Sequence, residues 1–154
     1  MTVIAIDEAY TAATDSGVWG DGIRSVTRKF VHTVDPKTGD RMFAAAAGPA
    51  HRMAELLLWV TTHGLDPDKF PQPRGDHDET LIVVYPDLKE IWEFCRSGVP
   101  FRVEAPYAAG EAAAVGGAIA LMCQGVPAGS ALRTLLGTGR FDSIHGPIHS
   151  SEDT

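Results

Sequence analysis

Thr2 carries a hydroxyl group that removal of Met1 would place beside a free α-amine. An initiator methionine is usually removed when the next residue is as small as threonine. The unperturbed pKa of an N-terminal amine is about 7.7 to 8.0, so part of the amine is neutral at physiological pH and accepts the hydroxyl proton. Thr2 is therefore a candidate nucleophile, although a Met-Thr start alone is also common in proteins without such chemistry.

Residue types that often bind metals or phosphate are present, but their spacing argues against such sites. Residues 76–79 (Asp-His-Asp-Glu) lie in a charged segment that is typical of solvated surface. His145 and His149 are four residues apart, but Gly146 and Pro147 preclude the helix that would align both on one metal. Residues 137–139 lack the lysine of a phosphate-binding loop. We therefore expect no metal and no cofactor.

Composition predicts one soluble domain spanning residues 1–154. The net charge of -7, with the 13 basic residues scattered, argues against nucleic acid as a partner. No apolar run is long enough to span a membrane, and no signal peptide is recognisable, so we expect a cytoplasmic protein without a membrane partner. Cys95 and Cys123 are isolated in apolar contexts and are expected to be reduced cysteines that pack in the interior.

The first half of the chain reads as strands followed by a helix. Strands are predicted at residues 3–6, 10–14, 30–34 and 41–47, separated by turns at 15–17, 20–22 and 35–40, in an antiparallel meander. A helix is then predicted from Pro49 to Gly64, because four apolar residues follow the helical period. These are Met53, Leu56, Leu57 and Val60.

The second half predicts strands and then two helices. Residues 65–79 are expected to form a loop without a core face, and strands are predicted at 81–85, 91–94 and 101–103. An alanine- and glycine-rich helix is predicted over 107–124, and a second helix over 130–136, capped by Ser130 and Gly137. The order of elements predicts a layered α+β fold of two antiparallel sheets with helices outside.

Five short motifs in this order resemble the proteasome β-subunit and HslV peptidases, in particular the short proteasome-like proteins of bacteriophages and their bacterial hosts. They are residues 1–5 (MTVIA), 12–16 (AATDS), 27–30 (TRKF), 44–48 (AAAAG) and 141–148 (FDSIHGPI). The resemblance implies an N-terminal nucleophile hydrolase, a four-layer αββα sandwich whose threonine attacks an amide carbonyl. Because residues 65–79 stand where larger members have a second long helix, the outer helical layer is expected to be reduced.

The resemblance also assigns roles to individual residues. It implies that Thr2 is the nucleophile, Lys29 the cation beside it, and Asp15 the carboxylate that pairs with the lysine. Such an ammonium would lower the pKa of the threonine hydroxyl and of the α-amine. Ala47 and Gly48 match the segment whose backbone N–H stabilises an oxyanion. Without the resemblance, Lys29 reads as a solvated lysine and Asp15 as a turn residue.

Two positions depart from the family pattern. Members usually carry Gly-Ser-Gly just before the small-residue helix, whereas residues 102–107 read RVEAPY and contain no serine. In the closing motif Asp142 is present, but His145 stands where members have a serine or threonine. Asp142 and His145 are thus accessory site candidates in an altered hydrogen-bond network.

Three functions are compatible with these residues. The first is a threonine peptidase in a self-compartmentalising homo-oligomeric ring, with peptides or unfolded proteins as substrates and an AAA+ unfoldase as a partner implied by the resemblance. The second is a catalytically degenerate protein that keeps the fold for a structural or regulatory purpose. The third is an amidase or acylase that acts on a small molecule.

Overall fold

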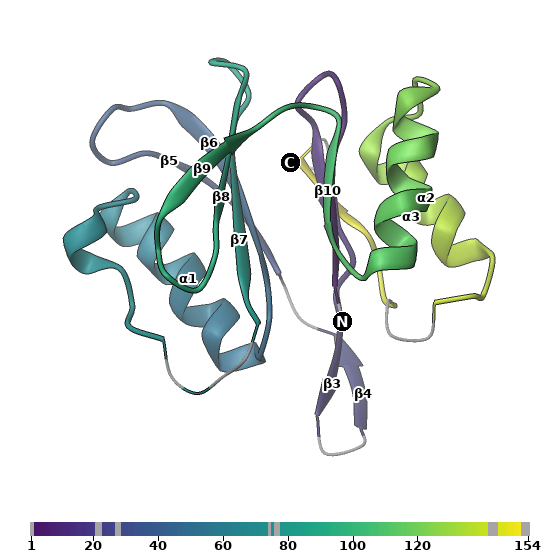
Figure 1. Cartoon of the computed structure of the whole chain (residues 1–154), viewed down its shortest axis with the longest axis horizontal. Coiled ribbons are helices and arrows are strands. Elements are labelled where there is room, and N and C mark those ends of the chain that lie inside the picture. The colour runs from purple at the N-terminus through teal and green to yellow at the C-terminus, as the bar shows by residue number, and fades with distance from the viewer. Residues whose placement is uncertain are drawn as a thin grey trace.

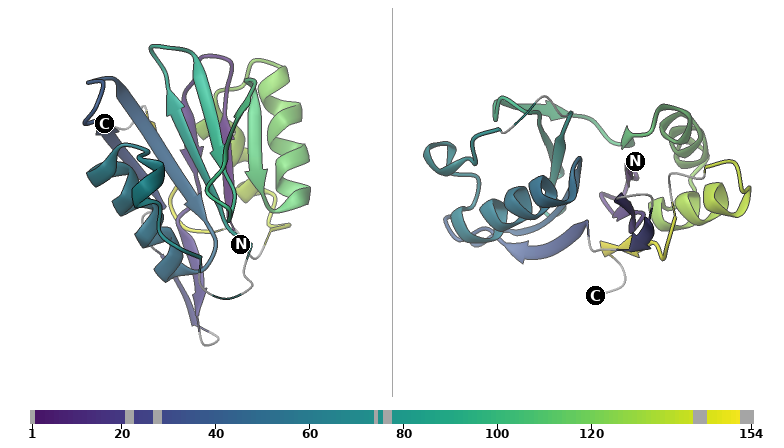
Figure 2. Two further views of the ribbon diagram at one scale, coloured as in Figure 1. Left: turned by 60° about the vertical axis from the view of Figure 1, so that its left-hand side comes forward. Right: turned by 90° about the horizontal axis from the view of Figure 1, so that it is seen from below.

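Two antiparallel β-sheets lie face to face at the centre of the molecule, and helices cover their outer faces (Figure 1). The computed structural model describes residues 2–20, 23–26, 29–73, 75, 78–141 and 145–151. Across the molecule the layers are α1 (Ala50–His63), a five-stranded sheet, a four-stranded sheet, and a pair of helices, α2 (Ala112–Cys123) and α3 (Ala128–Gly137) (Figure 2). This confirms the predicted α+β fold, a four-layer αββα sandwich.

The N-terminal strand lies inside the four-stranded sheet, whose order is β10-β1-β2-β11. Its strands are β1 (Val3–Ile6), β2 (Ala12–Thr14), β10 (Tyr107–Gly110) and β11 (His149–Ser150). All four residues of β1 are buried, which explains their uninterrupted apolar run. The strand predicted over 10–14 begins only at Ala12, because Tyr10 adopts a positive φ of 62° in the preceding turn.

The second sheet is a meander in which each strand pairs with the next one in the chain. It contains β5 (Phe30–Val34), β6 (Arg41–Ala47), β7 (Thr80–Tyr85), β8 (Glu90–Phe94) and β9 (Pro100–Val103). These strands agree with the sequence, but the predicted meander of the first half is wrong. Residues 3–6 and 12–14 belong to one sheet and residues 30–34 and 41–47 to the other, with the hairpin of β3 (Gly17–Gly20) and β4 (Ile23–Val26) between them. Residues 21 and 22 of its turn lie outside the described residues.

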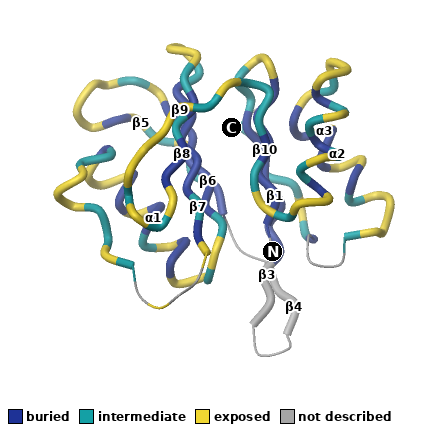
Figure 3. The backbone as a smooth tube through the Cα atoms, in the orientation of Figure 1, coloured by how far each residue is buried: buried dark blue, intermediate teal, exposed yellow. Residues whose placement is uncertain are grey.

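Apolar side chains fill the three interfaces between the four layers, and the central strands are the most deeply buried part of the fold (Figure 3). Between the sheets, Ile4 and Ile6 of β1 pack with residues of the other sheet such as Phe43. On the outer side of the five-stranded sheet, α1 contributes Met53, Leu56, Leu57, Trp59 and Val60. Each sheet therefore has a layer of apolar side chains on both of its faces, and this packing fixes the positions of the two sheets.

The helix predicted from the 3.6-residue period is confirmed as α1. It ends at Gly64, which adopts a left-handed φ of 53° and donates its N–H to the Val60 carbonyl at 3.1 Å. The following loop contains a short 3-10 helix, η1 (Pro67–Lys69). Contrary to expectation it does have a core face, since Leu65 and Phe70 pack against the outer core and the rings of Trp59 and Phe70 lie 4.9 Å apart.

The helix predicted over 107–124 is wrong at its start, because residues 107–110 form β10 beside β1. Within the predicted range, only the residues of α2 are helical, and this helix buries Ala114, Ala118 and Met122. The second predicted helix begins earlier than expected. Pro127 is its N-cap rather than Ser130, and the Ala128 N–H is held by Asp7 Oδ2 at 2.8 Å.

Both cysteines are exposed, so the expectation that Cys95 and Cys123 pack in the interior is wrong. Among the described residues, no helix has the length and apolar character needed to cross a bilayer.

Candidate functional site

A cavity of about 470 Å³ opens at the ends of the central strands and brings together segments that are far apart in the chain. Thr2 and Lys29 line it from the N-terminal part of the chain, and Ala47 and Gly48 line it at the end of β6. Glu111, which follows β10, also contributes to the wall. Four of the predicted site residues thus share one cavity.

Thr2 immediately precedes β1 and is held by its backbone. Its carbonyl oxygen accepts the Glu111 N–H at 2.8 Å, and only 5% of the residue is exposed. A β-carbon on Gly110 would lie 1.9 Å from that oxygen, so only glycine allows β10 to approach so closely. These contacts fix the direction in which the Thr2 side chain leaves the strand.

Lys29 lies just before β5, and its ammonium group joins Thr2 to Asp15. The Nζ donates to Thr2 Oγ1 at 2.7 Å and to Asp15 Oδ2 at 3.0 Å. The residue is 1% exposed, and its carbonyl oxygen accepts the Ala46 N–H at 3.0 Å. The solvated lysine that the sequence alone would suggest is therefore not what the structure has.

Asp15 is fully buried, and its carboxylate is satisfied by backbone donors as well as by the lysine. Oδ1 accepts the Val3 N–H at 3.0 Å, and Oδ2 accepts the Gly17 N–H at 3.3 Å in addition to the Lys29 ammonium. A buried ion pair is tolerated only when hydrogen bonds satisfy its remaining lone pairs, and this carboxylate meets that condition.

Burial lowers the pKa of the Lys29 ammonium below its ordinary value of 10.5, and the neighbouring Asp15 carboxylate partly opposes this shift. Desolvation disfavours the charged form, whereas the opposite charge and hydrogen bond of Asp15 favour it. An ammonium that donates directly to a hydroxyl oxygen stabilises the negative charge that forms there on deprotonation. The cluster is thus electrostatically suited to a nucleophilic Thr2.

Ala47 and Gly48, at the end of β6, line the same cavity. Gly48 adopts a φ of 139°, and a β-carbon there would crowd Glu79 at 3.2 Å. The small side chains leave the backbone of this segment accessible from the cavity, which a backbone oxyanion donor requires.

His145 lies beside the site rather than in it. Its carbonyl oxygen accepts the Ser16 N–H at 3.3 Å, and its ring packs so closely on Gly17 that a β-carbon there would lie 2.1 Å from Nδ1. His145 is buried but does not line the cavity. Asp142, the other accessory candidate, lies outside the described residues.

The structure adds site residues that the sequence did not indicate. Glu111 holds the Thr2 backbone and also caps α2, its carboxylate accepting the Ala113 and Ala114 N–H groups. Glu79, expected on the surface, is buried in an ion pair with Arg52 of α1. Within the described part of the chain, no three metal-binding side chains come together, while Asp76 and His77 lie outside it.

Solved structures with the same fold include Anbu, an ancestral β-subunit, from Yersinia bercovieri, with a TM-score of 0.69 and 13% identity over 97% of this chain and 80% of that one. HslV from Trypanosoma brucei has a TM-score of 0.60 and 19% sequence identity, over 98% of each chain. BPH from Thiobacillus denitrificans, in complex with epoxomicin, has a TM-score of 0.64 and 16% sequence identity, over 97% of this chain and 96% of that one. The sequence matches no family model and no curated protein.

These likenesses extend over nearly the whole chain, so the resemblance to the proteasome β-subunit and HslV that the motifs indicate is confirmed at the level of the fold. Sequence identities of 13% to 19% support a shared fold only, so the chemistry must be argued from the residues of the site.

Proposed function

We propose that this chain, which has the fold of Anbu and HslV, is a threonine peptidase whose nucleophile is Thr2 after removal of Met1. The observation that carries the proposal is the hydrogen bond of 2.7 Å from the buried Lys29 ammonium to Thr2 Oγ1, with Asp15 behind the lysine. A lysine rarely becomes fully buried without a specific partner. Here its partners include the candidate nucleophile and one carboxylate.

In the proposed reaction the free α-amine of Thr2 accepts the hydroxyl proton while Oγ1 attacks the carbonyl carbon of an amide. The backbone N–H of Gly48 stabilises the resulting oxyanion, and Lys29 stabilises the charge on the threonine oxygen. The amine then gives its proton to the departing nitrogen, and the C–N bond breaks to leave an ester on Thr2. Water, activated by the same amine, hydrolyses this ester and regenerates the hydroxyl.

A peptide is the substrate that we favour, since the cavity opens beside a backbone edge formed by small residues. β6 is paired with β7 through Ala47, but its pairing with β5 ends at Ala45, so Ala47 and Gly48 leave room on that side for an extended chain with its carbonyl directed at Thr2. The likeness to BPH, which was solved with epoxomicin bound, supports the use of that inhibitor as a probe.

The test is covalent labelling by epoxomicin, followed by intact mass spectrometry. The protein purified from cells should have lost the mass of one methionine and should gain one inhibitor adduct. Thr2→Ala should abolish the adduct, and Lys29→Ala should slow labelling by about 100-fold or more while the protein still folds. Thr61→Ala, an exposed threonine of α1, is the matched control and should label like the wild type.

Retention of Met1, or equal labelling of the Thr2→Ala variant, would overturn the proposed catalytic role. Met1 removal without any labelling would instead favour the second candidate, a degenerate protein that keeps this fold for a structural purpose. The absence of a serine in residues 102–107 is the feature that motivates it. Turnover of small amides but not of peptides would indicate the third candidate, an amidase or acylase.

We further propose that the chain forms a self-compartmentalising homo-oligomeric ring in the cytoplasm, which receives unfolded protein from an AAA+ unfoldase. Anbu from Pseudomonas aeruginosa, which has the same fold with a TM-score of 0.62 and 12% identity, was solved as a helical assembly. An oligomer would restrict access to Thr2, whose site in a single subunit opens directly to solvent.

A further inference from the structure

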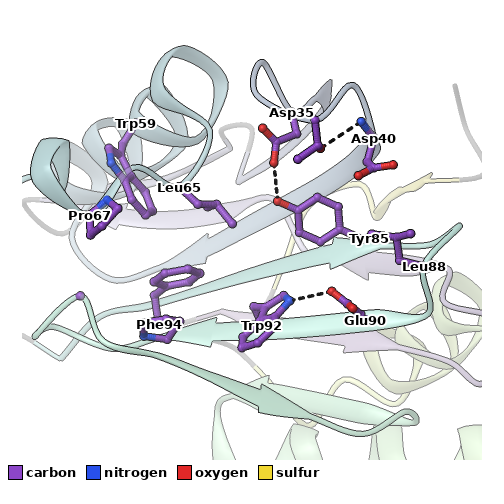
Figure 4. Close-up of a pocket in the computed structure, with 13 residues that line it drawn as sticks. Asp35, Asp40, Trp59, Leu65, Pro67, Tyr85, Leu88, Glu90, Trp92 and Phe94 are labelled. Atoms are coloured by element: carbon purple, nitrogen blue, oxygen red, sulfur yellow. Dashed lines mark hydrogen bonds between the residues drawn. The ribbon is translucent and has the colours of Figure 1, made fainter.

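A second cavity, of about 450 Å³, lies on the outer face of the five-stranded sheet and shares no lining residue with the Thr2 cavity (Figure 4). It opens beside the C-terminal end of α1, over β7 and β8, where α1 no longer covers the sheet. The turn between β5 and β6 closes one end, and the loop after α1 closes the other. The proposed peptidase chemistry makes no use of this cavity.

Four aromatic side chains form the walls of this second cavity. Trp59 comes from α1, Tyr85 from β7, and Trp92 and Phe94 from β8. The rings of Trp59 and Phe94 meet edge to face, with centroids 5.4 Å apart and planes at 78°. Trp92 is only partly buried, so its ring borders the opening of the cavity. Trp59, Tyr85 and Phe94 are themselves buried, so Trp92 is the aromatic ring that a ligand meets at the opening.

Three carboxylates line the end of the cavity that faces the β5–β6 turn. Asp35 accepts the Tyr85 hydroxyl at 2.8 Å, Glu90 accepts the Trp92 Nε1–H at 3.2 Å, and Asp40 lies beside them. Among the described residues, none of these three carboxylates has an ion-pair partner and no basic side chain lines the cavity. The carboxylates are therefore neutralised by no cation of the described chain.

The three carboxylates also act on Tyr85, whose pKa is raised. Burial raises this pKa above its ordinary value, and the Asp35 hydrogen bond and the charges of Asp35, Asp40 and Glu90 raise it further. A negative environment disfavours a phenolate for the same reason that it favours a bound cation.

We propose that this second cavity binds a small organic cation, a molecule with one amine-type positive charge attached to an apolar or aromatic body. Aromatic faces and carboxylates attract such a cation together, the ring quadrupoles at short range and the charges from further away. A volume of 450 Å³ is in the range of small-molecule sites, which are largely apolar with a few placed polar groups. The three carboxylates would repel an anion, and a neutral molecule would gain from them a hydrogen bond but no charge attraction.

The test uses benzyltrimethylammonium as the probe, with benzyl alcohol and benzenesulfonate as neutral and anionic counterparts. Binding is followed by isothermal titration calorimetry and by the indole N–H resonances of Trp59 and Trp92, assigned from the Trp92→Phe variant. The cation should bind about tenfold or more tightly than benzyl alcohol, benzenesulfonate should not bind, and salt should weaken the cation's binding.

Charge-neutral variants test the carboxylates without changing the shape of the cavity. The double variant Asp40→Asn/Glu90→Gln should lower the affinity for benzyltrimethylammonium by about tenfold. Glu8→Gln, the same change at an exposed residue of the β1–β2 turn, should leave it unchanged. Circular dichroism and thermal melting confirm that each variant is folded.

Equal binding of benzyl alcohol, an unchanged affinity in the double variant, or no binding at millimolar cation would overturn the proposal. A change of oligomeric state in the double variant without any cation binding would also overturn it, and would assign the cavity to a contact between subunits. Thr2→Ala should bind the cation like the wild type, so the outcome is independent of the peptidase proposal.

Discussion

Lys29 is the residue on which the proposed site depends most, because its one charge serves two partners. The ammonium lies between Thr2 Oγ1 and Asp15 Oδ2, and among the described residues no other basic side chain lines the Thr2 cavity. Without Asp15 the buried ammonium would lack a compensating charge, and without Lys29 the buried carboxylate would lack one. Stability and the proposed chemistry therefore rest on the same pair.

A double-mutant cycle measures this coupling. Asp15→Asn and Lys29→Met should each lower the free energy of unfolding by about 3 kcal/mol or more, because each leaves one buried charge unpaired. The double variant removes both charges, so its loss should be smaller than the sum of the two by about 2 kcal/mol. Urea unfolding gives all four values, and strict additivity would show that the two groups are not coupled in the folded state.

The lowered pKa of Lys29 predicts the alkaline side of the pH–rate profile. Inactivation by epoxomicin should increase as the α-amine loses its proton and then decrease as Lys29 loses its own. Because burial lowers the Lys29 pKa, the midpoint of this decrease in the inactivation rate should lie below pH 10.5. Asp15→Asn removes the charge that opposes this lowering, so its alkaline limb should move to still lower pH. A limb at or above 10.5 would contradict the proposed role of the ammonium.

At the scale of residues, the sequence predicts that Thr2, Asp15 and Lys29 meet, and they do so in the structure. That prediction depended on the resemblance, since composition and periodicity alone suggested a turn aspartate and a solvated lysine. Glu79 shows the limit of such reasoning. Its partner Arg52 is 27 residues away in the chain, and no local pattern signals a long-range ion pair.

Elements with a clear apolar period are predicted well from the sequence, and the alanine- and glycine-rich segment is not. The period of α1 identifies it, whereas residues 107–124 have too few large side chains to distinguish a strand from a helix. Gly110, with a φ of 116°, separates β10 from α2, and Glu111 caps the helix although glutamate is an unusual N-cap. Residues 107–110 are identified as a strand by their pairing with β1 in the folded structure, for example Ala108 with Ala5, and not by their own sequence pattern.

The contact between Gly17 and His145 joins the start of β3 to the segment before β11, and it can be tested by filling the space. Gly17→Ala should lower the free energy of unfolding by about 1 to 3 kcal/mol, because the new β-carbon would overlap the His145 ring. Combination with His145→Ala should recover part of this loss. Chemical denaturation measures each variant.

The matched control is Gly116→Ala on the exposed side of α2, where a β-carbon meets nothing within 4 Å. This variant should be more stable than the wild type by about 0.5 to 1 kcal/mol, since glycine disfavours helix. If Gly17→Ala were as stable as Gly116→Ala, the His145 ring would have room to move and would not hold this end of the site.

At the scale of the molecule, the two outer layers differ. Two helices, α2 and α3, cover the four-stranded sheet, whereas α1 and the short η1 cover the five-stranded sheet. The resemblance predicts this reduction, because residues 65–79 stand where larger members have a second long helix. It does not predict the consequence, the cavity walled by Trp59, Tyr85, Trp92 and Phe94.

The proposed ring predicts that the purified protein is an oligomer with a defined number of subunits. Native mass spectrometry and size-exclusion chromatography should give the same mass for the wild type and for Thr2→Ala, since assembly does not depend on the nucleophile. A monomer at micromolar concentration would contradict the ring and would favour the non-peptidase functions.

The burial of Thr2 also sets an order of events in the life of the protein. In the folded chain the residue is 5% exposed and its carbonyl is tied to the Glu111 N–H, so the bond before it is a poor target for an aminopeptidase. Glu111 leaves the ribosome 109 residues after Thr2, which at ~5–20 residues per second gives a window of roughly 5 to 20 seconds. On the proposed mechanism, Met1 must therefore be removed from the nascent chain before the fold closes, and a molecule that folds first would keep Met1 and stay inactive.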